Sequence, residues 1–300
     1  MTKIMRLALE EDIGAGDVTT RACVPEGLRA RGTLIAREPL VLAGTEVLDQ
    51  MFDHVILLKH DGDRCVEGDL LATVEGNART LLERERVALN FVQRLSGVAT
   101  LARQFADAVA GTNCRVLDTR KTTPGMRALE KRAAAAGGVT NHRMGLFDAI
   151  LIKNNHIAAA GSVRAALTRA GQLPAQASQS QPDPAAQPGV SPNVGQVANL
   201  RPIVNRPSDA LPIEIEVRTL AELHEALDAG AQHLLLDNLS PAEAADWVRE
   251  IAGRATVELS GGITLETVRA YAETGADFVS VGAITHSAPA ADISFRLQLL

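Results

Sequence analysis

Residues 233–262 read HLLLDNLSPAEAADWVREIAGRATVELSGG, and this stretch indicates the fold class of the longer part of the chain. Two short apolar runs, HLLLD and TVELS, flank a segment with clear helix boundaries. Ser240 is a typical N-cap, Pro241 suits the first helical position, and Gly253 suits the position after the last turn. A strand, a helix and a second strand in this order predict a right-handed unit with two parallel strands.

The same rhythm recurs on both sides of this stretch. Other apolar runs are CRVLD (114–118), FDAILI (147–152), IEIEV (213–217) and DFVSVGA (277–283), and helical patterns cover 219–230 and 264–275. Alternating strands and helices favour a parallel sheet covered by helices. The runs number six and no GxGxxG motif follows the first, which favours an incomplete parallel α/β barrel over an open dinucleotide-binding sheet.

The N-terminal part of the chain has a different pattern. TLIAREPLVLAG (33–44) and DGDRCVEGDLLATVEG (61–76) combine short apolar runs with glycines, as in a small β-sheet with tight turns. Apolar residues then recur at helical spacing from Leu81 to Val109, and two helices could meet at Gly97. The sequence therefore predicts a first domain of a different architecture.

Residues 171–209 interrupt the second pattern. They contain seven of the thirteen prolines and six glutamines. This composition favours a solvated insertion over a binding arm. Because the insertion follows a helix and precedes a strand, we expect it on the barrel face opposite the active site.

The composition excludes several classes of function. Of the 300 residues, 46% are hydrophobic and 3% are aromatic, and the net charge is −6, which argues against base stacking and broad polyanion binding. The three cysteines have no zinc or disulfide spacing, no apolar run is long enough to span a membrane, and acidic residues stand where a signal peptide would be apolar. We therefore expect a cytoplasmic protein that binds neither nucleic acid nor membrane.

Charged residues or glycines stand at the C-terminal end of every predicted barrel strand, where α/β barrels carry their active sites. Cations follow the first two strands, carboxylates lie at the next two, and glycines follow the last two. These residues are Arg120, Lys121, Lys153, Glu216, Asp237, Ser260, Gly261, Gly262 and Gly282, and the loop between the first two strands adds His142 and Arg143. Cations bind carboxylates and phosphates, carboxylates suit sugar hydroxyls or hydrated Mg²⁺, and glycines let backbone N–H groups reach a phosphate. The pattern predicts a ligand with a phosphorylated sugar and an acidic group.

Each of these residues also has a structural interpretation. Lys153 could be a surface lysine, and Glu216 and Asp237 could cap the helices that follow them. No GxSxG, HExxH or GxxxxGK[ST] motif is present, so the pattern indicates positioning and electrostatic stabilisation rather than a covalent nucleophile.

The stretch 118–157, DTRKTTPGMRALEKRAAAAGGVTNHRMGLFDAILIKNNHI, resembles the quinolinate phosphoribosyltransferase family. Motifs on both sides continue the resemblance: EDIGAGDVTT (11–20), ERVALNFVQRLSGVATLA (85–102), IEIEVRTLAE, LLLDNLSP, VELSGGI and VSVGAITH. The resemblance implies an N-terminal α/β sandwich domain (1–110, joined by 286–300) and an incomplete α/β barrel domain (111–285). It also implies a reaction. Quinolinate and phosphoribosyl pyrophosphate give nicotinate mononucleotide, pyrophosphate and CO₂, with Mg²⁺, as part of NAD biosynthesis.

The resemblance also implies roles for individual residues. The pocket for the two quinolinate carboxylates would contain Arg120, Lys121, His142, Arg143 and Lys153, with Thr119 beside them. Glu216 and Asp237 would face the ribose hydroxyls and Mg²⁺, and both would act in catalysis with Lys153. Arg94 would reach the site of a neighbouring subunit, which implies a homodimer or a hexamer of dimers with shared active sites. The 5′-phosphate cradle would consist of Ser260, Gly261, Gly262 and Gly282.

Two features depart from the family pattern. Asn154 stands where the family usually has aspartate, and the insertion at 171–209 is longer than the usual connection. The alternatives are a phosphoribosyltransferase-like protein associated with molybdenum transport, a nicotinate phosphoribosyltransferase, and a phosphosugar-binding barrel without catalysis. The cations Arg120, Lys121, Arg143 and Lys153, together with His142, favour a dicarboxylate substrate over the first two.

Overall fold

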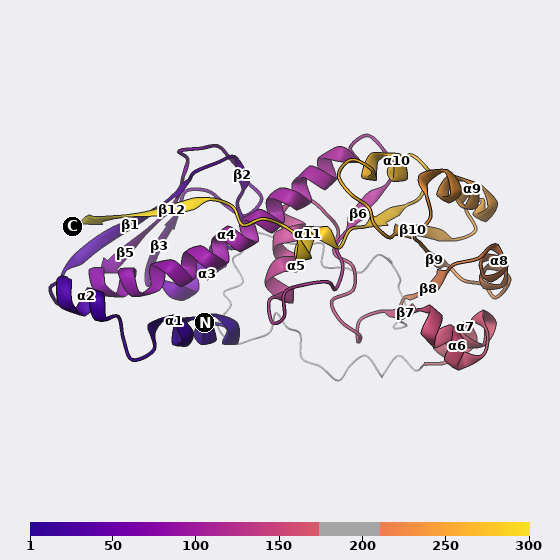
Figure 1. The fold of residues 1–300 in the computed structure, drawn as a ribbon, viewed down its shortest axis with the longest axis horizontal. Helices are drawn as coiled ribbons and strands as arrows, with labels where there is room; N and C mark the ends of the chain where they lie inside the picture. Colours follow the sequence, from indigo (N-terminus) through magenta and orange to yellow (C-terminus); the bar gives the residue numbers. More distant parts are fainter. Residues whose placement is uncertain (174–210) are drawn as a thin grey trace. The chain divides into compact units, whose positions relative to one another are not determined.

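The computed structural model describes residues 1–173 and 211–300, so the predicted insertion at 171–209 lies almost entirely outside the described residues. The chain divides into two compact units (Figure 1). The first comprises Met1–Arg103, Thr122–Gly138 and Ile284–Leu300, and the second comprises Gln104–Lys121 and Val139–Ala283. The segment Thr122–Gly138 lies within the predicted barrel domain, 111–285, but groups with the first unit. An ion pair between Arg132 and Glu46, with 2.5 Å between nitrogen and oxygen, is one contact that holds it there.

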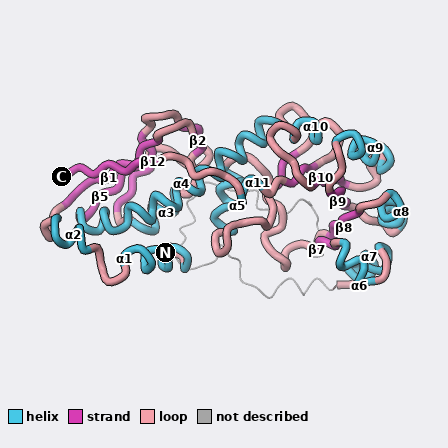
Figure 2. Tube along the Cα trace, in the orientation of Figure 1, coloured by secondary structure: helices cyan, strands magenta, loops and turns pink. Residues whose placement is uncertain are grey.

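The first unit is built on an antiparallel sheet of four strands in the order β12-β1-β5-β3. The C-terminal strand β12 (Ile293–Leu299) pairs with β1 (Arg29–Ala36) along its whole length, which ties the end of the chain to its beginning. Figure 2 shows α3 and α4 running along this sheet. The other elements of the unit are β2 (Leu40–Val41), β3 (His54–Leu57), β4 (Arg64–Cys65), β5 (Leu70–Asn77), α1 (Lys3–Ile13), α2 (Val18–Cys23), α3 (Thr45–Met51) and α5 (Arg127–Ala136).

Helix α4 (Ala78–Ala108) is a single helix of 31 residues, so the sequence-based suggestion of two helices meeting at Gly97 is wrong. The glycine serves another purpose. A Cβ atom at Gly97 would overlap the carbonyl group of Pro289, so only glycine lets the returning C-terminal segment approach the helix this closely.

The second unit contains a parallel sheet of six strands in the order β6-β11-β10-β9-β8-β7, which confirms the predicted α/β barrel architecture. Within the described residues the edge strands β6 and β7 do not pair, so the barrel is incomplete there. The strands are β6 (Arg115–Leu117), β7 (Ile150–Ile152), β8 (Ile213–Val217), β9 (His233–Asp237), β10 (Thr256–Ser260) and β11 (Phe278–Ser280). The helices are α6 (Asn154–Ala160), α7 (Val163–Gly171), α8 (Leu220–Asp228), α9 (Pro241–Ile251) and α10 (Val268–Ala272), and the short α11 (Ala283–His286) begins at the unit boundary.

Local signals place the helices as the sequence predicts. Ser240 caps α9 by accepting a hydrogen bond from the Glu243 amide, and the Glu243 carboxylate accepts one from the Ser240 amide in return. Thr219 caps α8 by accepting a hydrogen bond from the Glu222 amide. These caps fix the residue at which each helix begins. The residues between the cap and the end of the preceding strand therefore stay outside the helix and are available for a site.

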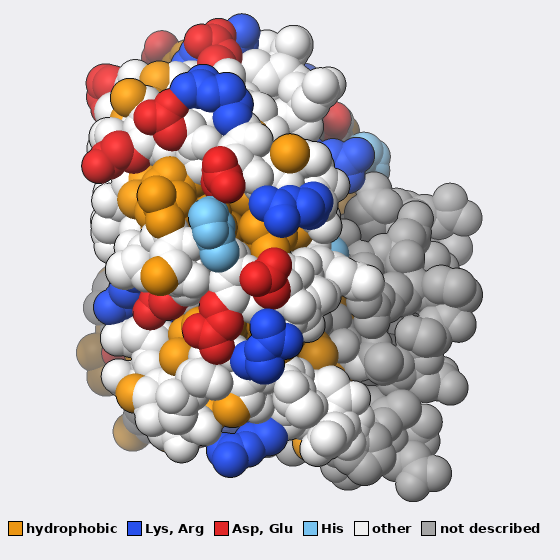
Figure 3. Space-filling view, turned by 90° about the vertical axis from the view of Figure 1, so that its right-hand side faces the viewer, with side chains coloured by type: hydrophobic (Ala, Val, Ile, Leu, Met, Phe, Trp, Pro, Cys, Tyr) orange, Lys and Arg blue, Asp and Glu red, His pale blue; other side chains and the backbone are white. Residues whose placement is uncertain are grey.

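The outer helical face of the second unit carries charges of both signs. Figure 3 shows Lys and Arg side chains interspersed with Asp and Glu side chains on the side where α7, α8 and α9 lie. Among the described residues, no helix combines the length and the apolar character that crossing a bilayer requires.

Candidate active site

The register of the parallel strands aligns the predicted charged residues at the C-terminal end of the sheet. Lys153 follows β7 directly, and the β7–β8 pairing of Ile152 with Ile215 carries it next to Glu216. Glu216 is in turn in register with Leu235 of β9. Asp237 and Ser260 pair with each other two residues further on, at the last position of β9 and β10. Because side chains two residues apart share a face, these groups line the same C-terminal end of the strands.

Glu216 is the centre of a charge network at this end. Its side chain is 2% exposed, and its Oε2 accepts a hydrogen bond of 3.1 Å from Lys153 Nζ. Its Oε1 accepts hydrogen bonds from Arg218 Nε at 3.0 Å and Nη2 at 2.7 Å. Arg218 Nη2 also lies 4.0 Å from Asp237. A buried carboxylate is therefore held by two half-exposed cations whose other faces remain open to a ligand.

Sequence reasoning missed Arg218. Its place in the sequence could have indicated it, because Arg218 follows β8 directly, as Lys153 follows β7. Both are cations placed at a strand end.

The predicted phosphate cradle adjoins Asp237. Gly261 has a φ of +106°, and a Cβ atom there would approach the backbone nitrogen of Asn238 to 2.8 Å. Asn238 itself adopts a φ of 60°, and its side-chain amide donates to Asp237 at 2.7 Å. Gly262 also has a positive φ. The turn after β10 thus requires glycine and leaves its backbone accessible; Gly282 lies just after β11, at the same end of the sheet.

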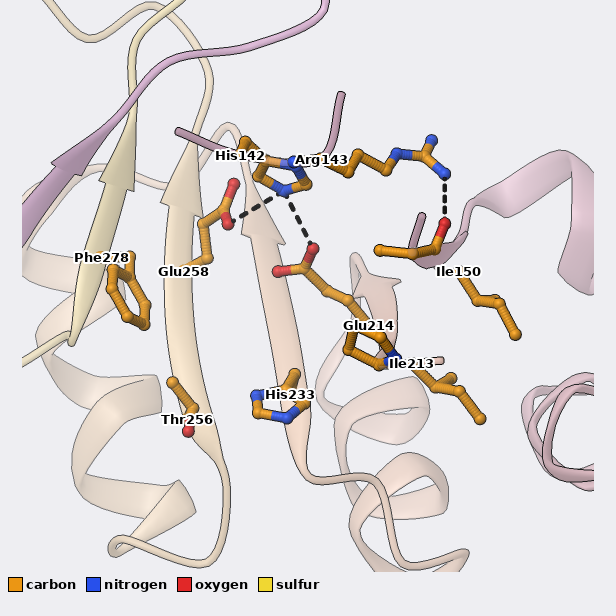
Figure 4. Close-up of a pocket in the computed structure, with 11 residues that line it drawn as sticks. His142, Arg143, Ile150, Ile213, Glu214, His233, Thr256, Glu258 and Phe278 are labelled. Carbon is orange, nitrogen blue, oxygen red and sulfur yellow. Dashed lines mark hydrogen bonds and ion pairs between the residues drawn. The ribbon is translucent and has the colours of Figure 1, made fainter. Parts of the chain in front are cut away.

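His142 lies deeper, with its ring turned into the barrel (Figure 4). Its Nδ1 accepts a hydrogen bond of 2.7 Å from the Arg143 amide. Its Nε2 lies 3.2 Å from Glu214 and 3.4 Å from Glu258. Sequence reasoning predicted neither Glu214 nor Glu258 as a site residue, although each lies two residues before a predicted site residue on the same strand face.

Burial and the neighbouring charges shift the pKa of His142 in opposite directions. Burial lowers the pKa of His142, and the neighbouring carboxylates of Glu214 and Glu258 act in the opposite direction and raise it. The Arg143 amide nevertheless donates to Nδ1, which can accept only when it carries no proton. While this hydrogen bond is formed the ring is neutral and its proton lies on Nε2. Burial, followed by the charge of Glu258, raises the pKa of Glu214 to about 7.

The remaining predicted cations are Arg143, which follows His142, and Arg120 and Lys121, which follow β6. Burial lowers the pKa of Arg143, and the nearby charge of Arg120 lowers it further, so the two guanidinium groups lie close enough to repel each other. Arg143 Nη1 donates to the Ala149 carbonyl at 3.0 Å. The Lys121 amide donates to Thr119 Oγ1 at 3.0 Å, which shapes the turn after β6. This concentration of positive charge suits an acidic ligand.

Arg94 is not part of this group. It lies in the first unit, where Nε and Nη2 donate to Glu130 at 3.1 and 2.8 Å and Nη1 donates to the Ala288 carbonyl at 2.7 Å. Nη2 also donates to the Thr285 carbonyl. These contacts hold Arg94 within its own chain, and its expected contact with the site of a neighbouring subunit stays a prediction.

A cavity lies on the opposite side of the His142 ring from the strand ends. Its lining includes Ile213, His233, Thr256 and Phe278, the first residues of their strands, together with His142, Arg143, Glu214 and Glu258. Lys153, Glu216 and Asp237 do not line it. We assign the substrate site to the strand C-terminal ends, where the paired cations, carboxylates and glycine turn converge, and not to this acid-lined cavity.

Comparisons with known proteins agree with this geometry. Residues 17–96 match the family model described as quinolinate phosphoribosyl transferase, N-terminal domain, and residues 98–179 and 193–296 match the corresponding C-terminal domain. The chain belongs to the quinolinate phosphoribosyltransferase family. A nicotinate-nucleotide pyrophosphorylase (carboxylating) of Mycobacterium leprae is 40% identical over 98% of this chain and 95% of its own length. A probable enzyme of the same name from Bacillus subtilis is 35% identical over 100% and 94%.

Solved structures of the family show the same fold. The crystal structure of NadC from Streptococcus pyogenes superimposes with a TM-score of 0.82 at 36% identity, over 99% of this chain and 96% of that one. The expected family and its two-part architecture, a small sheet domain and a partial α/β barrel, are thereby confirmed.

Proposed function

We propose that this quinolinate phosphoribosyltransferase family member transfers the phosphoribosyl group of phosphoribosyl pyrophosphate to the ring nitrogen of quinolinate. The products are nicotinate mononucleotide, pyrophosphate and CO₂. The names of its relatives support this reaction. The observation that carries it is the network in which buried Glu216 is held by Lys153 and Arg218 beside Asp237.

The acidic substrate has a matching environment at one side of this network. Lys153 has half of its side chain exposed, and Arg120 and Arg143 lie close to each other. Together with Lys121 these groups supply the cations that two carboxylates need. A monocarboxylate such as nicotinate would leave part of this positive charge unpaired, so the pocket favours the dicarboxylate.

Glu216 and Asp237 act on the ribose of phosphoribosyl pyrophosphate. As the C1–pyrophosphate bond breaks, positive charge develops on the ribose ring, and the negative charges of Glu216 and Asp237 stabilise it. The pyridine nitrogen then forms the new bond to C1. The ring is now cationic and accepts the electron pair left when the 2-carboxylate departs as CO₂, and a proton then takes its place on the ring carbon.

Of the two carboxylates predicted to face Mg²⁺, Asp237 is the better holder for a divalent metal. Both oxygens of Glu216 accept hydrogen bonds from cations, so Glu216 does not fit as a direct ligand in this arrangement. Asp237 fits better, because it is partly exposed and its nearest guanidinium nitrogen is 4.0 Å away. A Mg²⁺ ion held by Asp237 through its waters would offset the charge of the departing pyrophosphate.

Assembly and location form the rest of the proposal. A homodimer, or a hexamer of dimers, remains our expectation for the working enzyme. A cytoplasmic location is consistent with the three cysteines, which are all free thiols.

A turnover assay tests the proposed reaction. The purified protein is incubated with quinolinate, phosphoribosyl pyrophosphate and Mg²⁺, and nicotinate mononucleotide and CO₂ are measured, with nicotinate as the control substrate. We expect product from quinolinate and little from nicotinate. A folded protein that binds phosphoribosyl pyrophosphate but forms no product from quinolinate would refute the proposal.

A further inference from the structure

The side chain of His142 joins the loop before β7 to two inner strands of the barrel. Its ring nitrogens contact the Arg143 amide on one side and the carboxylates of Glu214 on β8 and Glu258 on β10 on the other (Figure 4). The backbone amide of His142 also donates to Asp118 at 2.8 Å. The loop residue that precedes Arg143 is therefore anchored through both its backbone and its side chain.

The hydrogen bond at Nδ1 determines what Nε2 can do. An unprotonated Nδ1 leaves the single proton of the neutral ring on Nε2, which then donates to a carboxylate. Glu258 needs such a donor, because it is 2% exposed and neither of its oxygens accepts a hydrogen bond within the described part of the chain. A buried carboxylate without a donor is costly, so the His142 N–H is well placed to serve both acids.

The same three side chains offer atoms within 4.8 Å of one another, a spacing that could hold a metal ion. A metal-binding histidine almost always donates its second ring N–H to an acceptor. Here the second nitrogen accepts instead, which leaves the proton on the nitrogen that a metal would need. The geometry therefore favours a hydrogen-bonded anchor over a metal centre.

We propose that Glu214 and Glu258 are positioning residues for the acidic substrate, and that they act through His142. Glu214 is the hydrogen-bond partner of Nε2, and the charge of Glu258 lies 3.4 Å from the same nitrogen, so the two acids fix the ring. The ring holds the Arg143 amide, and the guanidinium of Arg143 is kept beside Arg120, where the carboxylates of the substrate would bind. This inference rests on the proposed function, because it assigns Arg143 to the dicarboxylate end of the site. Neither acid contacts the substrate.

Steady-state kinetics of two Glu258 variants test the proposal. Glu258→Leu removes the acceptor, and we expect the KM for quinolinate to rise about tenfold, with kcat and the KM for phosphoribosyl pyrophosphate within about twofold of wild type. Glu258→Gln keeps a hydrogen-bond acceptor and should restore most of the affinity for quinolinate. Should Glu258→Leu not fold, Glu214→Gln provides the second variant, with a smaller expected rise confined to the same constant.

A matched control lies on the surface of the same unit. His224 and Glu250 form a pair of the same kind at 3.2 Å, but both side chains are more than half exposed. Glu250→Gln should leave both KM values unchanged. Equal changes for both substrates, or a loss of thermal stability with an unchanged KM for quinolinate, would show that Glu258 is only structural and would overturn the proposal.

Nitrogen-15 NMR of the wild-type protein provides a readout that needs no turnover. We expect a neutral His142 ring protonated at Nε2, and this result would stand even if quinolinate proved not to be the substrate. Addition of Zn²⁺ or Mn²⁺ alone should leave the His142 signal in place. Stoichiometric binding of either ion that shifts this signal would replace the anchor with a metal site.

Discussion

Replacement of Lys153 by methionine separates the role of its charge in catalysis from its role in folding. Lys153 Nζ lies 3.1 Å from Glu216, but half of the lysine side chain is exposed, so the pair is screened by solvent. Such a pair contributes about 1 kcal/mol or less to stability. Arg218 continues to hold the other oxygen of Glu216 in the variant. We therefore expect the melting temperature to fall by no more than about 4 °C.

Activity should respond much more strongly. A charge-assisted hydrogen bond to a substrate carboxylate is worth about 1.5–3 kcal/mol, which corresponds to a loss of roughly 10- to 150-fold in kcat/KM. The assay measures nicotinate mononucleotide formation across a range of quinolinate concentrations, alongside thermal unfolding. The matched control is Lys59→Met in the first unit, where Lys59 pairs with Asp69 at 3.2 Å, and its kcat/KM should not change. Normal kcat/KM in Lys153→Met would refute the assignment of Lys153 to the substrate.

Three further outcomes follow from the geometry. Asp237→Asn should raise the Mg²⁺ concentration needed for half-maximal turnover while the fold is retained, and an unchanged Mg²⁺ titration would remove Asp237 as the metal holder. Gly261→Ala should cost about 1–3 kcal/mol in stability and reduce affinity for phosphoribosyl pyrophosphate, because the added methyl group meets Asn238 at a positive φ; unfolding curves and binding titrations check both effects. Burial raises the pKa of the Cys114 thiol to about 12, so alkylation at pH 8 followed by mass spectrometry should label exposed Cys23 first, and rapid labelling of Cys114 in the folded protein would contradict its burial.

Much of the barrel could be predicted from local sequence signals. The apolar runs and the Ser240 cap are properties of short segments, and the structure places strands and helix α9 where these signals indicated. The charged strand ends were also predictable. Parallel strands present their C-terminal ends at one edge, so Lys153, Glu216 and Asp237 meet without any need to know the details of packing.

Other features depended on residues that are distant along the chain. A glycine within a long helical pattern can interrupt the helix or allow another segment to approach closely. The contact of the Pro289 carbonyl with Gly97 could not be predicted from the helix sequence alone. The hydrogen-bond partners of Arg94 could not be predicted either, because Glu130 and the Ala288 carbonyl come from segments that only folding brings to it. Its contacts within the chain therefore could not be predicted from its motif.

The fold class, the family and the charged strand ends could be predicted from the sequence, because periodicity, caps and motifs are local and repeat along the chain. The pairing of the polar groups depended on the folded structure. His142 and Glu214 are 72 residues apart, and they meet because the strand register and the inward-facing alternation place the two side chains in the same barrel interior. Arg218 was likewise assigned to Glu216 only by the fold. Hydrogen bonds are directional and short, so their partners are fixed by three-dimensional positions and not by composition.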